Sequence, residues 1–231
     1  MKHAPYSYSK ISTFQQCPLK FKFQYIDRIP VDQQQSPAIE RGLAAHKFAE
    51  DYLSTGVHQI TNEFPDSYID WLYAIDPVHA LAEFKLGVTE ELDATEYDDA
   101  FIRGIADIIV IHGDRLTVVD IKTGSVTKNR KEVWPDTLKK HRTQCGLYAE
   151  MVSLALHELF DMDQPVESVP YYMDLLGPQP LPEPVDPSLP ILNRIKKNCL
   201  AVEQCVSFPA RPNRFCGWCP YSKANGGPCK L

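Results

Sequence analysis

The chain contains 231 residues, of which 44% are hydrophobic and 23% are charged, and this composition is ordinary for one globular domain with a substantial core. The first residues lack the apolar stretch of a signal peptide, and no hydrophobic run is long enough to cross a bilayer. We therefore expect a cytoplasmic protein that has no membrane partner. The net charge of -6 argues against a general nucleic-acid binder, because such proteins usually carry an excess of Lys and Arg.

Helices are expected where apolar residues recur at helical spacing. They span residues 10–16, 41–53, 137–160 and 191–206. In the last of these, the apolar stripe consists of Leu192, Ile195, Cys199, Val202 and Val206. Residues 19–25 alternate like a strand but carry aromatic residues at helical spacing, so both alternatives stay open. Residues 63–80 are expected to be irregular with helical turns.

Strands are expected where short runs are rich in β-branched and aromatic residues. They span residues 80–88, 105–111, 116–122 and 168–175. Residues 177–190 contain many prolines and are expected to form an extended loop. No internal repeat is visible, so residues 1–231 are expected to form a single domain.

Residues 105–111 and 116–122 have the pattern of a β-hairpin, because Gly113 and Asp114 separate them. If these two residues form the centre of a type II′ turn, Asp107 lies directly opposite Asp120, and Lys122 shares their face of the sheet. The same face is expected to carry several apolar residues. They are Ile105, Ile109, Ile111, Leu116 and Val118.

The two carboxylates and the ammonium would thus lie in apolar surroundings. Like charges that face each other destabilise a sheet, and desolvating an ionised group is costly unless a counter-charge compensates. A divalent cation would compensate, so we predict a metal site at Asp107 and Asp120. The alternative is a pair of solvated aspartates at a strand end, which explains Lys122 less well.

A basic stretch begins at the same hairpin. Between Lys122 and Arg142 the chain has seven Lys and Arg residues, against only Glu132 and Asp136. Beside a metal site, this excess suits a polymer with a phosphate backbone. Taken alone, the excess is equally compatible with a solvated surface loop.

The chain has seven cysteines, and an odd number favours free thiols or metal ligation over a disulfide framework. Cys216, Cys219 and Cys229 lie in a C-terminal stretch whose prolines and glycines preclude a long helix. Cys17, near the other chain end, is the best candidate for a fourth ligand. Spacing alone does not separate zinc from an iron–sulfur cluster. Packing roles are expected for the other cysteines, which are Cys145, Cys199 and Cys205.

Several short motifs resemble the PD-(D/E)XK nucleases and specifically their RecB-like branch. The hairpin contributes Gly104-Ile-Ala-Asp107 and Asp120-Ile-Lys122-Thr-Gly. The other matching motifs are Arg41-Gly-Leu-Ala-Ala-His46, Gln144-Cys-Gly-Leu-Tyr148 and Ser9-Lys-Ile-Ser-Thr-Phe-Gln-Gln-Cys17-Pro18. Any one motif would be weak, but together they span nearly the whole chain.

The resemblance implies an α/β fold with a restriction-endonuclease-like core, in which helices flank a central mixed β-sheet. It also implies a 4Fe-4S iron–sulfur cluster on Cys17, Cys216, Cys219 and Cys229. This cluster would join residues 1–30 and 207–231 into one cluster-binding region. The gap between Cys219 and Cys229 is longer than in that pattern, so zinc stays open as the alternative metal.

The resemblance also implies a set of ligands for Mg²⁺ or Mn²⁺. Asp107 and Asp120 would bind the cation, and His46 and the Ile121 carbonyl would complete the set. Glu83, on a neighbouring strand, is a weaker candidate, because an ordinary surface glutamate is equally compatible with its position.

The implied reaction is metal-dependent hydrolysis of phosphodiester bonds in linear DNA, either single- or double-stranded. Lys122 would orient or deprotonate the attacking water, while Gln144 and Tyr148, one helical turn apart, would bind the water, the phosphate or a nucleotide. We expect an exonuclease of recombination, repair or phage DNA processing. Two alternatives stay open, a CRISPR-associated nuclease that processes spacers and an inactive DNA-binding subunit with a structural metal cluster.

Overall fold

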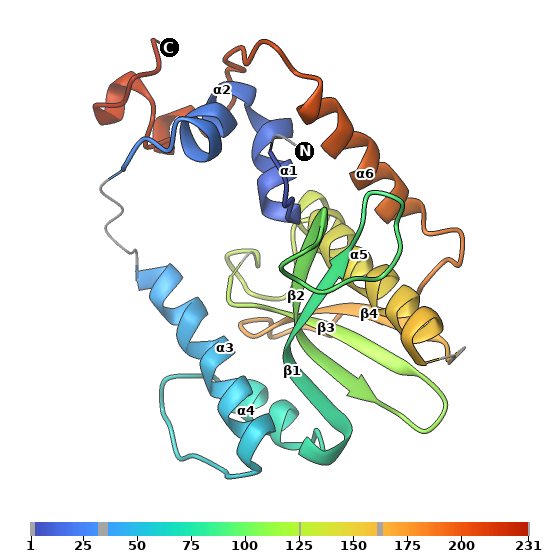
Figure 1. Ribbon diagram of the computed structural model, residues 1–231. Coiled ribbons are helices and arrows are strands. Elements are labelled where there is room, and N and C mark those ends of the chain that lie inside the picture. Colours follow the sequence, from blue (N-terminus) through green and yellow to red (C-terminus); the bar gives the residue numbers. More distant parts are fainter. Residues whose placement is uncertain (1–2, 32–36, 125, 161–163, 231) are drawn as a thin grey trace.

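The computed structural model describes residues 3–31, 37–124, 126–160 and 164–230. Its centre is a mixed five-stranded sheet with the strand order β1-β2-β3-β4-β5 (Figure 1). The strands are β1 (Ala80–Val88), β2 (Ile102–Ile111), β3 (Leu116–Lys122), β4 (Val166–Tyr172) and β5 (Glu183–Pro184). Neighbouring strands are antiparallel except for β3 and β4, which run parallel.

Helices cover both faces of this sheet (Figure 1). One face carries α5 (Pro135–Phe160) and α6 (Pro190–Glu203), and the other carries α3 (Pro37–Thr55) and α4 (Asp66–Tyr73). Because parallel strands need a crossover connection, α5 joins β3 to β4. The remaining helical segments are α1 (Tyr8–Gln16), α2 (Pro18–Phe21), a π-helical turn (Lys22–Ile26) and the 3-10 turns Pro77–His79, Cys216–Trp218 and Lys223–Asn225.

The sheet separates two hydrophobic cores, which we call the α5 core and the α3 core. The α5 core includes Ile109, Leu116, Val118, Leu147 and Met151. The α3 core includes Phe48, Tyr68, Ile108, Val119 and Ile121. Burying one such large apolar side chain stabilises the fold by about 1.5–3 kcal/mol, so the alternation of β3 between the two cores fixes the orientation of the whole strand.

The hairpin has the predicted register. Ile108 pairs with Val119 and Ile111 pairs with Leu116, which is the alignment that places position 107 opposite position 120. Neither Gly113 nor Asp114 has a positive φ, so the loop between the strands is not the predicted type II′ turn. The register holds nevertheless, because the loop still has two residues and the His112 N–H donates to the Arg115 carbonyl across it over 2.8 Å.

Most predicted elements are present, and the differences lie near their ends. Residues 19–25, for which strand and helix were both open, are helical. The C-terminal helix ends at Glu203, so Val206, which is 99% exposed, does not belong to its apolar stripe. The proline-rich loop contains the short edge strand β5, a position that tolerates proline because the edge needs no further N–H donor.

The packing roles predicted for three cysteines are confirmed for two of them. Cys145 and Cys199 are fully buried. Cys205 is only half-buried, and its thiol donates to the Ser207 carbonyl over 2.9 Å, so the expected core role is wrong there. The cause is the early end of α6, which carries Cys205 beyond the helix and out of the core.

Segments from the two ends of the chain lie side by side (Figure 1). The Leu19 N–H donates to the Pro209 carbonyl over 3.2 Å, and the rings of Phe21 and Phe208 stack with centroids 6.1 Å apart. Aromatic stacking of this kind adds to simple burial, so these contacts hold the N-terminal helices against the C-terminal segment.

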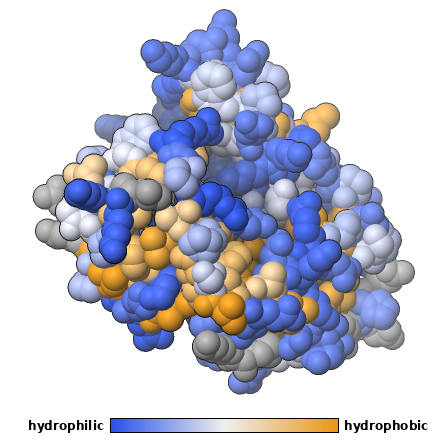
Figure 2. Space-filling model, turned by 90° about the horizontal axis from the view of Figure 1, so that it is seen from above, coloured by the Kyte–Doolittle hydropathy of each residue, from blue (hydrophilic) through white to orange (hydrophobic). Residues whose placement is uncertain are grey.

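No helix among the described residues is both long and apolar enough to span a membrane. Seen from above, hydrophilic residues cover most of the molecule, and hydrophobic residues gather in one area (Figure 2).

Gly104 allows β2 to pass close beneath α5. A Cβ at this position would lie 2.8 Å from Cδ1 of Tyr148, so the ring would have to move. We expect Gly104→Ala to lower the free energy of unfolding by about 1–3 kcal/mol in urea titrations. Gly113→Ala is the control, because a Cβ there has no atom within 4 Å. Equal stability of the two variants would contradict this packing.

Candidate active site

The alternation of β2 between the two cores is interrupted at Asp107. In a regular strand, Ala106 and Ile108 would point to the same side of the sheet. Here Ala106 packs in the α5 core and Ile108 in the α3 core. Ile109 then returns to the α5 core. Asp107 and Ile108 therefore lie consecutively on the α3 side, although the pairing of β2 with β1 keeps the same register before and after this position.

Strand β1 changes sides at the facing position. Ala82 packs against the α3 core, whereas Leu86 belongs to the α5 core, although both have even numbers. Between them, Glu83 has a φ of 48°, a left-handed conformation that is rare and costly for a residue other than glycine. The register of the two strands aligns Ala82 with Ile108 and Phe84 with Ala106, so Glu83 faces Asp107.

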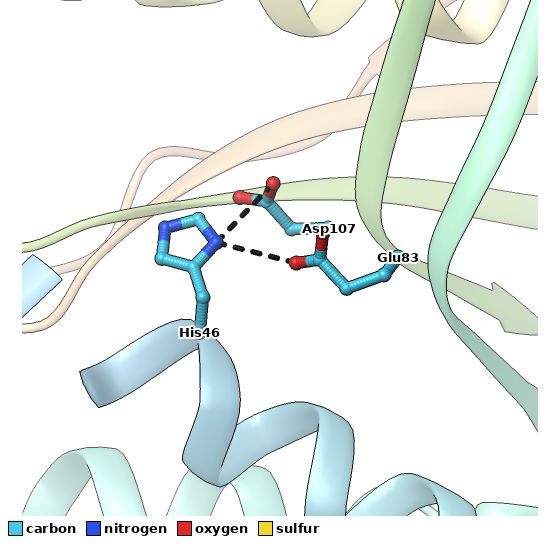
Figure 3. A group of neighbouring side chains, drawn as sticks. All are labelled: His46, Glu83 and Asp107. Carbon is cyan, nitrogen blue, oxygen red and sulfur yellow. Dashed lines mark ion pairs between the residues drawn. The ribbon is translucent and has the colours of Figure 1, made fainter. Parts of the chain in front are cut away.

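These two interruptions bring three side chains together beneath α3. His46 extends from α3 toward the carboxylates of Glu83 and Asp107 (Figure 3). Its Nδ1 lies 3.5 Å from Oε1 of Glu83 and 3.4 Å from Oδ1 of Asp107. One ligand atom from each residue lies within 4.8 Å of the others, and we call this set the histidine–carboxylate group. It offers one nitrogen and two oxygen donors to a cation.

Two opposing effects act on the imidazole of His46. Burial disfavours the charged ring, but the neighbouring carboxylates of Asp107 and Glu83 outweigh burial and raise its pKa to about 10. His46 is therefore protonated at neutral pH in the metal-free protein and compensates the two acids. A cation that used this nitrogen would have to displace the proton.

Asp107 also contacts β3 directly. Its Oδ2 accepts a hydrogen bond of 2.6 Å from the Ile121 N–H. The carboxylate thus spans the gap that opens between β2 and β3 beyond the last paired residues, Ile108 and Val119. This contact holds Oδ2 of Asp107, whereas His46 lies beside Oδ1.

Asp120 lies on the other side of β3 from its neighbours Val119 and Ile121, which belong to the α3 core. Its side chain is only 2% exposed, and Nζ of Lys122 forms an ion pair with its Oδ2. Oδ2 is thus a buried oxygen that lies against the ammonium of Lys122. Burial raises the pKa of Asp120 to about 6, because the attraction of Lys122 does not offset the loss of water.

A chain of contacts continues from Asp120 onto α5. Lys122 donates from Nζ to Oε1 of Gln144 over 3.2 Å, and Nε2 of Gln144 donates to the Tyr148 hydroxyl over 3.3 Å. Tyr148 is buried against Gly104, and burial raises the pKa of its hydroxyl well above the usual range. We call Asp120, Lys122, Gln144 and Tyr148 the lysine chain.

The single face predicted for both aspartates is therefore wrong. Lys122 shares the α5 side with Asp120 as expected, but Asp107 and Ile105 lie on the α3 side, because the interruption at Asp107 breaks strict alternation. The two acids nevertheless interact across the gap, since Asp107 contributes to the raised pKa of Asp120.

A salt bridge that the sequence did not signal anchors α3 beside the site. Both terminal nitrogens of Arg41 contact the carboxylate of Asp174, at 2.6 Å and 2.8 Å. Arg130 contacts the same carboxylate at 3.2 Å. Bidentate pairs of this kind are directional, so the bridge holds the N-terminal part of the helix that carries His46.

The four cysteines predicted as ligands, Cys17, Cys216, Cys219 and Cys229, line one small cavity between the two chain ends. The Arg211 N–H donates to Sγ of Cys17 over 3.4 Å, and the Asn213 N–H donates to Sγ of Cys216 over 3.3 Å. Among the described residues, no three of these sulfur atoms lie within 4.8 Å of one another.

Residues 5–75 and 70–224 match the PD-(D/E)XK nuclease superfamily. The chain belongs to this superfamily, and its mixed sheet flanked by helices agrees with the core of that fold. No curated protein matches the sequence.

Two solved structures resemble the fold. The "putative exonuclease" from Eubacterium rectale is 12% identical with a TM-score of 0.51, over 97% of this chain and 88% of that chain. SSO0001 is 19% identical with a TM-score of 0.44, over 98% of this chain and 87% of that chain. At these identities the first likeness concerns the fold alone, and the second TM-score is too low to support an argument.

Asp120→Asn is expected to stabilise the metal-free protein at neutral pH. Because the folded state raises the pKa of Asp120 from 3.8 to about 6, it holds the proton more tightly than the unfolded chain, and the free energy of unfolding falls as the pH rises through this window. Asn does not ionise and avoids this loss, so the variant should exceed the wild type by about 1–3 kcal/mol above the window. Below it, the two should be equal.

Urea unfolding in EDTA at several pH values measures this difference. A variant that is less stable than the wild type above the window would show that the buried Asp120 carboxylate is better compensated than its surroundings indicate.

Proposed function

We propose that this chain is a metal-dependent DNA nuclease that acts as an exonuclease on linear DNA. The observation that carries the proposal is the meeting of the histidine–carboxylate group and the lysine chain at one gap in the sheet. Membership of the nuclease superfamily supports phosphodiester hydrolysis as the reaction. The name of the Eubacterium rectale protein suggests exonuclease action, which we extend to this chain as part of the proposal.

Four side chains would hold the cation. His46, Glu83 and Asp107 offer ligand atoms within 4.8 Å of one another, and the buried Oδ2 of Asp120 has one ammonium beside it. A buried carboxylate with so little compensation is costly, so the donor set fits a cation that would add to it. Carboxylate oxygens suit both Mg²⁺ and Mn²⁺, while the imidazole favours Mn²⁺. The Ile121 carbonyl stays in the proposal as a further ligand.

The reaction would divide between the cation and the lysine chain. When bound, the cation would polarise the scissile phosphate and lower the pKa of a water molecule. Lys122 would orient that water and offset the charge that develops on the phosphate in the transition state. Gln144 would hold the ammonium by accepting from its Nζ, and Tyr148 would fix the Gln144 amide.

DNA is the proposed partner, and Lys122 to Arg142 would supply part of its phosphate contacts. The lysine chain argues against an inactive binding subunit. Its buried charges are costly to the fold, and DNA binding alone does not require them.

We further propose that Cys17, Cys216, Cys219 and Cys229 hold a 4Fe-4S cluster that joins the chain ends. All of them line one cavity, and backbone N–H groups already point at two of the sulfur atoms. Hydrogen bonds of this type stabilise thiolate ligands and tune iron–sulfur clusters. Zinc is the alternative occupant of the same cavity.

The activity is tested with end-labelled linear DNA and circular DNA in Mn²⁺ or Mg²⁺. The wild type should release nucleotides from linear DNA only. Asp107→Asn and Lys122→Gln should each lower the rate by at least about a hundredfold while the fold persists in circular dichroism. Asp114→Asn, at the hairpin loop where the side chain is 79% exposed, is the matched control and should keep full activity. Turnover by Asp107→Asn would exclude the proposed site.

The cluster is tested by visible absorbance and metal analysis after anaerobic purification. Wild-type protein should be brown with about four iron atoms per chain, as a 4Fe-4S cluster requires, and Cys216→Ser should lose both signals. Cys205→Ser, outside the cavity, should keep them. Colourless wild-type protein with stoichiometric zinc would replace the iron–sulfur proposal with the zinc alternative.

A further inference from the structure

Two basic side chains continue from the histidine–carboxylate group along β1 and β2. Lys85 lies two residues beyond Glu83 and pairs with Ile105. Two residues further along the strands, Gly87 pairs with Arg103. At about 3.3 Å per residue, Arg103 lies about 13 Å along the strand from Asp107. These residues follow the side of the strands that faces α3.

A surface hollow of about 620 Å³ begins at the candidate metal site. Its lining includes His46 and Glu83, and it extends to Lys85 and Ile105. The metal-binding end and the first basic residue therefore share one open space.

Tyr97 joins this hollow to a second one. Nζ of Lys85 lies 5.5 Å from the centre of the Tyr97 ring, and Cζ of Arg103 lies 4.5 Å from the same centre. Lys85 lines the first hollow, whereas Arg103 and Tyr97 line the second. Both cations thus lie over the Tyr97 ring, at distances typical of cation–π pairs.

The second hollow, also about 620 Å³, is strongly basic. Lys10, Arg28 and Arg103 line it together with Tyr25, and none of the described residues that line it is an Asp or Glu. Nζ of Lys10 lies 5.5 Å from the centre of the Tyr25 ring. In a chain with a net charge of -6, three cations around one hollow are a marked local excess.

Neighbouring groups leave these cations available. Arg103 has an ion pair of 3.8 Å with Asp98, but Asp98 is 93% exposed, and a pair so open to water contributes little. Lys10 donates to the carbonyls of His3 and Pro5 and is attracted by the Glu203 carboxylate, and an ammonium has a third donor for a further acceptor.

We propose that the two hollows form one path for single-stranded DNA that leads to the histidine–carboxylate group. We call it the β1–β2 path. Lys85, Arg103 and Arg28 contact phosphates along it, and the rings of Tyr97 and Tyr25 stack on bases. The assignment rests on the proposed function and names the form of DNA that reaches the site.

The alternation of cations and aromatic rings selects a single strand over a duplex. Single-strand binders combine a positive groove with rings on which unpaired bases stack. In a duplex the base faces are already stacked on one another, so Tyr97 and Tyr25 would have no base to contact. A duplex would use the cations alone.

Binding is measured by fluorescence anisotropy with a labelled oligothymidylate and with a matched duplex, in EDTA, so that the readout needs neither cation nor cleavage. The wild type should bind the single strand more tightly. Combining Lys85→Gln with Arg103→Gln should lower the slope of log affinity against log salt by about 1.4, because each lost phosphate contact on a single strand contributes about 0.7. Tyr97→Leu should weaken binding by at least about fivefold.

Arg115→Gln is the matched control. Arg115 belongs to the same hairpin, is 42% exposed against 33% for Arg103, and also pairs with a nearby aspartate, but it lies at the opposite end of β2. It should bind like the wild type, and Arg103→Lys should retain most of the affinity. Equal losses in Arg103→Gln and Arg115→Gln would overturn the path. Equal affinity of the wild type for duplex and single strand would overturn it as well.

The outcome for the proposed function is separate. Hydrolysis of bis(p-nitrophenyl) phosphate with Mn²⁺ requires the metal site but no strand contacts, so this assay of the wild type reports on the metal site alone. If the wild type lacked this activity but bound single strands as described, the nuclease proposal would fail while the path remained.

Discussion

The site depends on a paired interruption of two neighbouring strands. Where Glu83 faces Asp107, each strand changes the core into which its even-numbered residues point. An interruption in one strand alone would turn one acid toward α3. Two facing interruptions turn both acids toward His46. The unfavourable backbone of Glu83 persists because the two cores on either side fix the flanking residues. The packing of the flanking residues thus stabilises the unusual backbone that places the two carboxylates.

The gap between β2 and β3 joins two differently compensated acids. Asp107 has a protonated histidine and a backbone N–H beside it, whereas Asp120 has one ammonium in a dry environment. The protein therefore keeps one acid well satisfied and the other poorly satisfied in the absence of a cation. Sites that bind ions or substrates often contain such locally unfavourable groups, because the bound ligand supplies the missing compensation.

Much of the fold followed from the sequence because it rests on local rules. Loop length set the register of the hairpin, and apolar spacing located α3 and α5. The face of Asp107 did not follow, because strict alternation assumes a regular extended backbone, and the facing residue Glu83 departs from it. Nothing in the letter Glu at position 83 announces a left-handed backbone. The Arg41 and Asp174 bridge joins residues 133 positions apart, and one sequence gives no sign of such a pair.

The contact between the chain ends has a mechanical consequence. Phe23, which lies next to the Gln24 and Tyr25 wall of the second hollow, packs on Tyr221 with ring centroids 5.6 Å apart. Tyr221 in turn borders the cavity lined by the cysteines. A change in that cavity would therefore weaken the contacts between the two chain ends. It would also displace the part of the second hollow that Gln24 and Tyr25 line. On the proposed path, oxidation of these thiols would therefore weaken the binding of a nucleic-acid strand without a direct effect on the histidine–carboxylate group.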